Sequence, residues 1–280
     1  MTELKSSTSE VEAAGLAQAP APVVVRRGTN FGQIRELVAH LVVRELSRAH
    51  RETILGWTWP LVLLLVQLAA LVFIFGHVVD LNIPNYPVFL FTGLIAWTWF
   101  LTGVQNASWT LISHRDLVLQ PNCPPIVLPV VTVAVPVFDV AVALPLLVVM
   151  TLATGTFEWT VVLLVPLFTV QLLLMLGVAW IVAAISVYLR DVPRLVALAL
   201  MILFYLTPVF YAIVRVPEQF QSILLANPLG TLIESYRAVT LGDPFPPAGA
   251  FIAVAVGSGV LAAAGLWIFR ALEGGFVDEL

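Results

Sequence analysis

The chain has 280 residues, of which 60% are hydrophobic and only 11% are charged, and its formal net charge is −4. Soluble domains carry about 25% charged residues, so this composition excludes an ordinary soluble domain and indicates a membrane protein. The single cysteine, Cys123, excludes a disulfide framework and a cysteine-based zinc site, and Lys5, the only lysine, excludes a phosphate-binding loop of the G-x-x-x-x-G-K-[ST] type.

The first 30 residues are rich in Ser, Ala and Pro and show no apolar period. This composition predicts a flexible tail. Glu3, Lys5 and Glu10 stand where a signal peptide would have a basic segment and an apolar core, so no cleavable signal is expected.

Residues 31–52 are predicted to form an amphipathic helix at the membrane interface. Ile34, Leu37 and Leu41 fall mostly on one helical face, and Arg44 and Arg48 lie on the other. Such a helix either rests on lipid headgroups or also contacts a partner protein.

Residues 53–280 are predicted to form one domain of six membrane helices. A bilayer core about 30 Å thick needs about 20 apolar helical residues, and six apolar stretches meet this length. They are Thr53–Gly76, Tyr86–Ser108, Ile126–Ala153, Trp159–Leu189, Leu195–Val214 and Pro244–Phe269. The fold class expected is therefore an all-α membrane protein.

The basic residues predict the orientation of these helices. Under a six-span topology, 11 of the 13 Lys and Arg residues fall on the side of the termini, and only Arg215 and Arg237 fall on the other side. Because positive charge is retained in the cytoplasm, both termini are predicted to be cytoplasmic.

Asp139 is a carboxylate inside the third predicted span, between Pro136 and Pro145. Its carboxylate either accepts hydrogen bonds from backbone amides freed at a proline kink or lies on a water-filled path through the membrane. Both interpretations are open at this point.

Residues 223–233 are apolar but too short to cross a bilayer, and Asn227-Pro228 interrupts them. A re-entrant helical hairpin on the outer side is expected, shielded from lipid by other protein. Glu234 and Arg237 follow it at a spacing of three residues, which allows an ion pair; alternatively, Arg237 meets a phosphate of a carrier lipid.

Several short motifs, in matching order and spacing over residues 35–237, resemble the permease subunits of ABC-2-type polysaccharide exporters. They are Arg44-Glu45-Leu46, Leu55-Gly56, Trp59-Pro60, Tyr86-Pro87, His114-Arg115-Asp116-Leu117-Val118, Tyr188 with Arg190-Asp191, Thr207-Pro208-Val209-Phe210-Tyr211, Asn227-Pro228-Leu229 and Tyr236-Arg237. The chain departs from the pattern at His50, where an aromatic residue is usual, and at LVLQPNCPP, where basic residues and Phe-Pro are usual.

The resemblance implies a homodimer docked onto two copies of a separate ATPase, in the bacterial inner membrane. It implies no catalytic residue, metal or cofactor in this chain, with ATP and Mg on the partner, and no nucleic-acid partner. The loop Ser113–Pro125 is expected to be the coupling helix held by the ATPase. The residues expected at this contact are Arg44, Arg48, His114, Arg115, Asp116, Leu117, Arg190 and Asp191. Arg190 and Asp191 have an equal alternative as a local cap and anchor pair.

The implied cargo is a polysaccharide linked to a polyprenyl lipid, such as an O-antigen, a teichoic acid or a cell-wall galactan. Sugars stack on aromatic faces, so aromatic residues within the spans are candidates for the channel lining. With Asp139, these candidates are Trp97, Trp99, Phe100, Phe204, Tyr205, Phe210 and Tyr211; each has the alternative of packing or facing lipid.

Two other functions compete with this one. An ABC-2 permease for a small molecule or drug would share the topology. A membrane-embedded enzyme of lipid-linked sugar metabolism would need a cluster of carboxylates or histidines at one membrane face, and the sequence offers none.

Overall fold

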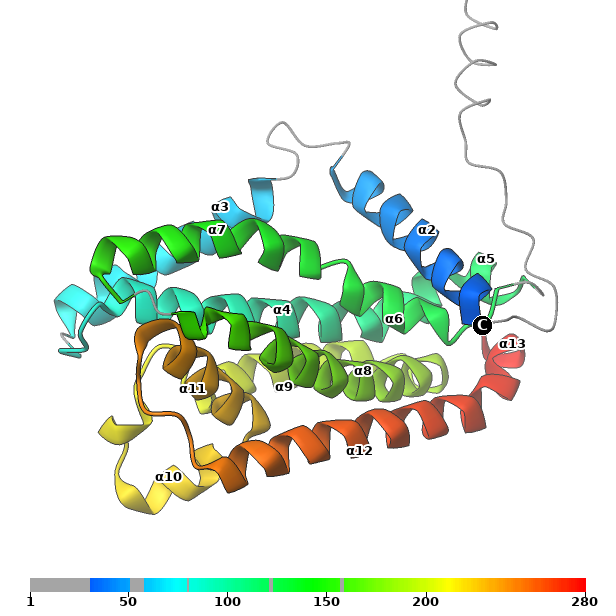
Figure 1. Cartoon of the computed structure of the whole chain (residues 1–280). Helices are drawn as coiled ribbons and strands as arrows, with labels where there is room; N and C mark the ends of the chain where they lie inside the picture. Colours follow the sequence, from blue (N-terminus) through cyan, green and yellow to red (C-terminus); the bar gives the residue numbers. More distant parts are fainter. Residues whose placement is uncertain (1–30, 51–57, 80, 121–122, 157–158) are drawn as a thin grey trace, which may run out of the picture.

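The computed structural model describes residues 31–50, 58–79, 81–120, 123–156 and 159–280. The predicted tail 1–30 and the end of the predicted interface helix at 51–52 lie outside these residues. The described chain is helical, and its elements run mostly along one long axis (Figure 1). They are α2 (Phe31–His50), α3 (Trp59–Leu71) with η2 (Val72–Val78), α4 (Tyr86–Ser113), α5 (Arg115–Val118), α6 (Val127–Ala134), α7 (Val137–Thr154), η3 (Trp159–Leu163), α8 (Leu164–Tyr188), α9 (Val192–Leu206), η4 (Ile213–Arg215), α10 (Glu218–Leu225), α11 (Pro228–Leu241), α12 (Ala248–Leu272), η5 (Glu273–Gly275) and α13 (Phe276–Glu279).

Five helical segments of the described chain are long and apolar enough to cross a membrane, and they correspond to five of the six predicted spans. They are Trp59–Val78, Tyr86–Ser113, Val127–Thr154, Thr160–Tyr188 and Ala248–Glu279. The multi-span helical fold is therefore confirmed.

The segment predicted as the fifth span is shorter than expected. Its helix, α9, has 15 residues, which is about 22 Å of helix and less than the bilayer core. It ends at Leu206, and the next residue, Thr207, is extended, because the residue before a proline is disfavoured in helical geometry.

The third span is broken in the middle, as its prolines predict. α6 ends at Ala134 and α7 begins at Val137, with Pro136 between the two helices. Proline lacks the N–H that would continue the helix and crowds the preceding turn.

Helix α4 forms the centre of the bundle. It contacts α3, α6, α7, α8, α9 and α11, and most of its side chains are buried, whereas α3 and α12 are largely uncovered by the rest of the chain. The main hydrophobic core surrounds residues 88–107 of α4.

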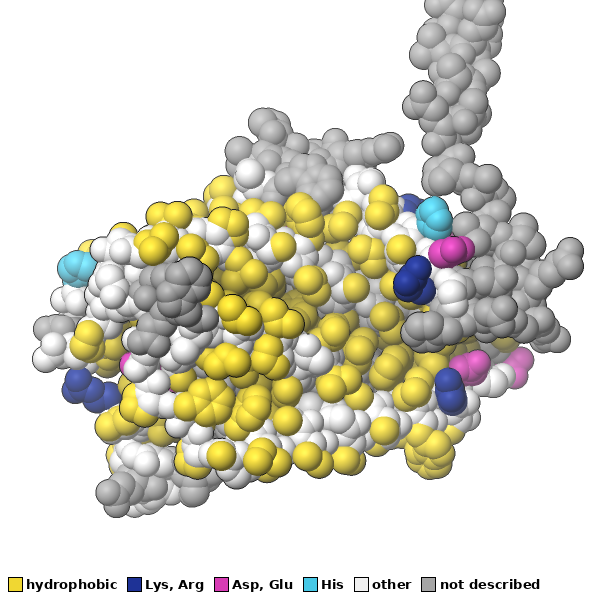
Figure 2. All heavy atoms as spheres, in the orientation of Figure 1, with side chains coloured by type: hydrophobic (Ala, Val, Ile, Leu, Met, Phe, Trp, Pro, Cys, Tyr) yellow, Lys and Arg dark blue, Asp and Glu magenta, His cyan; other side chains and the backbone are white. Residues whose placement is uncertain are grey.

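The exterior carries a broad hydrophobic band, with charged side chains at the two ends of the long axis (Figure 2). Exposed residues of the band include Leu63, Val66, Ile202, Val256 and Val260. Such a surface is stable in lipid, and in water it would be a large exposed apolar patch.

We call the two ends of the bundle the α5 end and the α10 end. The α5 end holds α2, α5, the turn between α8 and α9, and α13, and the α10 end holds α10 and the junction of α3 with α4 (Figure 1). A second hydrophobic cluster joins the elements at the α5 end; its buried members include Leu37, Leu41, Val118, Val127, Val187, Phe269 and Phe276.

The predicted break at Asn227-Pro228 separates α10 from α11. The Asn227 side chain accepts a hydrogen bond of 3.0 Å from the Leu229 amide, which caps the helix, and Pro228 occupies the first turn. At 14 residues α11 is too short to cross a bilayer. It is nearly all buried against α4, α8 and α12, as the predicted shielding requires.

Candidate functional site

The short helix α5 lies at the end of the bundle between α4 and α6. Val118 is buried in the second hydrophobic cluster, Leu117 is half-buried, and Arg115 and Asp116 are exposed. The helix is thus anchored on one side and presents opposite charges on the other.

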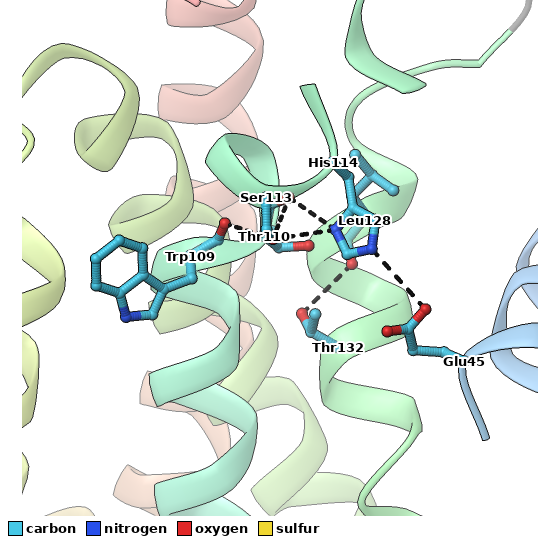
Figure 3. Close-up of polar contacts among 7 residues, drawn as sticks. All are labelled: Glu45, Trp109, Thr110, Ser113, His114, Leu128 and Thr132. Atoms are coloured by element: carbon cyan, nitrogen blue, oxygen red, sulfur yellow. Dashed lines mark hydrogen bonds and ion pairs between the residues drawn. The ribbon is translucent and has the colours of Figure 1, made fainter. Parts of the chain in front are cut away.

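Helix α2 packs by its apolar face against α6, in the same hydrophobic cluster that holds Val118 of α5. Leu37 and Leu41 are buried, whereas Arg44 and Arg48 are exposed, as the amphipathic pattern predicts. Glu45 adds a polar link, because its Oε2 lies 3.8 Å from Nε2 of His114 at the end of α4 (Figure 3). Glu45 was not among the sequence candidates, although it belongs to the motif Arg44-Glu45-Leu46.

The turn between α8 and α9 lies at the same end and exposes Arg190 and Asp191. Asp191 pairs with Arg194 at 3.0 Å, both side chains being 80% exposed. The Asp191 side chain makes no capping bond to the helix. The anchor pair at this turn is therefore formed by Asp191 and Arg194, and not by Arg190 and Asp191 as the alternative had it.

Tyr188 fixes this turn to the C-terminal segment. Its hydroxyl donates to the Leu272 carbonyl at 2.7 Å, and its ring contacts Phe276. The predicted coupling residues from α2, α4, α5 and the α8–α9 turn are thus brought to one end of the molecule.

Cys123 follows α5 and is buried in the same cluster. Burial raises the pKa of the Cys123 thiol above its ordinary value, and the positive charge of Arg44 partly opposes this shift.

Midway along the bundle, a cavity of about 280 Å³ lies between α3, α4 and α7. Asp139 lines it together with three polar side chains that sequence reasoning missed: Gln67, Thr98 and Thr102. Gln67 carries a usable signal, because it interrupts an otherwise apolar run. The hydroxyl of Thr98 donates a hydrogen bond to the Leu94 carbonyl.

The aromatic channel candidates divide between the core and the surface. Trp99 lines the mid-bundle cavity, and its Nε1 donates to the Val133 carbonyl at 3.3 Å. Trp97 and Phe100 are buried, and Trp97 contacts Phe204 with ring centroids 5.4 Å apart.

The remaining candidates extend this aromatic row to the surface of α9 and the chain after it. Phe204 and Phe210 are half-buried, and their ring centroids lie 5.6 Å apart. Tyr205 is 63% exposed, and the hydroxyl of Tyr211, half-buried, donates to its carbonyl at 3.1 Å. The assignment of the row to a channel stays a prediction.

At the α10 end, Arg237 is fully buried and pairs with Glu234 at 3.0 Å, as the spacing predicts. Its Nη2 also donates to the Val209 carbonyl at 2.7 Å, and its guanidinium lies over the Phe89 ring. The alternative role of binding a carrier phosphate is wrong for this conformation, because the protein itself surrounds the guanidinium.

These features define an all-helical, multi-span membrane protein with an amphipathic helix and a short charged helix at one end. A family model described as ABC-2 type transporter matches residues 36–241, and the chain belongs to this family. It is 34% identical to the O-antigen export system permease protein RfbA of Myxococcus xanthus over 260 residues, covering 92% of this chain and all of that protein.

Two further relatives have related names. An O-antigen export system permease protein RfbA of Klebsiella pneumoniae is 29% identical, covering 90% of this chain and 97% of that protein. The polysialic acid transport protein KpsM of Escherichia coli is 26% identical, covering 73% of this chain and 81% of that protein.

Proposed function

We propose that this chain is the membrane-spanning subunit of an ATP-driven exporter, which moves a lipid-linked polysaccharide out of the cytoplasm across the inner membrane. The observation that carries the proposal is the similarity to an O-antigen export permease along the whole length of that protein. Two relatives with names from different polysaccharide systems favour a glycan over a small molecule or drug.

ATP hydrolysis is assigned to two copies of a separate ATPase, which hold the ATP and Mg. We place the α5 end, with both termini, in the cytoplasm. There, Arg115 and Asp116 would enter a cleft of the ATPase, and closure of the ATPase dimer would push on α5. Because Val118 anchors α5 in the second hydrophobic cluster, that push is transmitted to α2, α6, α8 and α12 together.

The path for the glycan is assigned to a homodimer. The mid-bundle cavity, at about 280 Å³, is smaller than the roughly 300–1,000 Å³ of sites for drug-sized ligands, so this cavity by itself is too small for a polymer. Tyr205 and its exposed neighbours on α9 form a face that a second copy can cover.

The test is purification of the chain with its ATPase partner, followed by mass spectrometry of the retained lipid. A retained polyprenyl-linked glycan, together with lipid-linked glycan accumulating inside cells depleted of the chain, is the expected result. Depleted cells that export glycan normally but retain a drug would contradict the polysaccharide assignment and support the small-molecule alternative.

A further inference from the structure

The mid-bundle cavity has a composition that neither the proposed ATPase contact nor the proposed glycan path explains. It lies between α3, α4 and α7, beside the break of the third span. Among the residues that the structure describes, none of α9 lines it, so it is separate from the α9 face that we assign to the path. Its wall carries two indoles and four polar side chains and is otherwise apolar; the apolar residues are Pro60, Leu61, Leu63, Leu64, Ile95, Pro136, Val140 and Ala143.

Asp139 is the one charged side chain on this wall, as far as described residues form it. It is half-buried and stands in the first turn of α7. It already interacts within the chain, but an ionised carboxylate has about four acceptor sites, so a ligand can bind beside that interaction. Because a charge in an apolar surrounding is costly unless an opposite charge is near, the cavity favours a cation and disfavours a phosphate.

The neutral polar groups of the wall are better acceptors than donors. The Thr98 hydroxyl donates its single proton to the Leu94 carbonyl, so only its lone pairs remain for a ligand. Nε1 of Trp99 donates to the Val133 carbonyl, and an indole has no other donor. Gln67 and Thr102 can accept as well as donate. An ammonium group, which only donates, matches this wall, whereas an anion, which only accepts, does not.

The rest of the wall suits an apolar body. Trp59 is 44% exposed and Leu63 is 54% exposed, and both belong to α3, which the rest of the chain leaves largely uncovered. This side of the wall is therefore open to a ligand dissolved in the membrane, and an accessible indole attracts both cations and aromatic rings. The volume of about 280 Å³ is just below the roughly 300–1,000 Å³ of drug-sized sites, which fits a small amine that carries a ring.

We propose that the mid-bundle cavity binds a lipophilic amine in its protonated form, with the ammonium at Asp139 and Thr98 and the apolar body against Trp59 and Leu63. The bound amine would hold α3 against α4 and α7 and so stabilise the folded chain. This binding needs neither the ATPase nor the glycan, so it is independent of what the protein exports.

The test is isothermal titration calorimetry of the detergent-purified full chain at pH 7, with three ligands that share an indole ring. Tryptamine carries an ammonium, tryptophol has a neutral hydroxyl in its place, and indole-3-propionate has a carboxylate. One tryptamine per chain is expected, bound at least about tenfold more tightly than tryptophol or indole-3-propionate, and tryptamine should raise the unfolding temperature. Equal affinity for tryptophol would overturn the proposal, whether or not any variant folds.

Two substitutions place the ligand in this cavity. Asp139→Asn keeps the side-chain shape and removes the charge, so it should weaken tryptamine binding by about tenfold or more and leave tryptamine no tighter than tryptophol. Thr98→Val removes one neutral acceptor and should weaken binding by about threefold.

Two further variants serve as matched controls, and neither changes a residue that lines the cavity. Asp278→Asn removes an exposed carboxylate of α13, and Thr169→Val removes an exposed hydroxyl that donates to the Val165 carbonyl, four residues back as for Thr98; both should bind tryptamine as the parent chain does. If Asp139→Asn fails to fold, Thr98→Val against Thr169→Val decides the site. Tryptamine binding that is unchanged in Asp139→Asn or in Thr98→Val would overturn the proposal.

Discussion

Arg237 is fully buried, whereas the other described arginines are exposed. A buried charge is costly unless it is paired and hydrogen-bonded, and here the Glu234 carboxylate and the Val209 carbonyl meet the guanidinium. The same group lies over the Phe89 ring, 3.4 Å from its centroid, which adds a cation–π contact. One side chain therefore holds α11, α4 and the chain after α9 together.

Arg237→Met should destabilise the folded protein by about 3–5 kcal/mol, because it leaves the Glu234 carboxylate without its partner in a mostly buried site. Thermal unfolding of the purified protein in detergent measures this. Arg194→Gln removes an ion pair whose side chains are 80% exposed and should change stability by less than about 1 kcal/mol. Equal effects of the two substitutions would contradict the role given to Arg237.

Cys123 should react slowly with iodoacetamide at neutral pH. Burial raises the pKa of its thiol, so less of the reactive thiolate is present than in an exposed cysteine, and the rate should keep rising well above pH 8. The reaction rate is compared with that of an exposed cysteine, introduced as Arg190→Cys in a Cys123→Ala background. Mass spectrometry follows both reactions over pH 7–10. If Cys123 reacted as fast as the exposed cysteine, its buried position would be contradicted.

At the scale of the elements, α8 and α12 approach each other closely at two facing glycines, Gly177 and Gly265. A Cβ on Gly177 would lie 2.7 Å from the Leu261 carbonyl oxygen, and a Cβ on Gly265 would collide with the Gly177 carbonyl. Small residues of this kind let membrane helices approach through their backbones. Sequence alone did not single out this contact, because it joins residues about 85 positions apart.

Gly177→Ala should force α8 and α12 apart and cost about 1–3 kcal/mol, as overpacking of a tight contact does. Gly257→Ala is the matched control, since it lies on α12 with nothing within 4 Å of an added Cβ and alanine is the better helix former. Comparison of their thermal unfolding in detergent tests this; a Gly177→Ala protein as stable as the control would refute the close contact.

The apolar pattern predicted the long helices well and α9 less well. Hydropathy extends the fifth stretch to Val214, but Pro208 ends the helix at Leu206. The break after Ala134 and the start of α11 at Pro228 follow from local proline chemistry that the sequence displays. What could not be predicted is which faces meet: Gln67 and Thr102 reach the Asp139 cavity from two other helices.

Arg115→Glu should uncouple ATP hydrolysis from export, because it reverses the exposed charge of the helix that we assign to the ATPase contact. In proteoliposomes holding both subunits, hydrolysis should continue while export falls by about tenfold or more. Arg215→Glu reverses an exposed charge at the opposite end, where the guanidinium donates to the Asn82 carbonyl at 3.1 Å, and should leave export unchanged. Normal export by Arg115→Glu would remove α5 from the coupling role.

For the whole molecule, the hydrophobic band between two charged ends gives the position in the membrane but not the direction (Figure 2). Direction rests on the basic residues of the two ends: Arg44, Arg115 and Arg190 lie at the α5 end, and Arg215 lies beyond α9 on the way to α10. Positive charge is retained on the cytoplasmic side, and the proposed ATPase contact also requires the α5 end there. The two arguments are independent, so a single topology measurement tests both.

In a Cys123→Ala background, we compare a cysteine at Arg190 with one at Val214, which is 89% exposed just after the short helix α9. A membrane-impermeant maleimide added to intact spheroplasts should label the cysteine at Val214 and reach the one at Arg190 only after the membrane is opened. α9 alone is about 22 Å long, so this pair also tests whether the chain that follows α9 completes the crossing. Labelling of the Arg190 position in intact spheroplasts would reverse the orientation, and it would leave α5 and its charges on the side where no ATP is available to a partner.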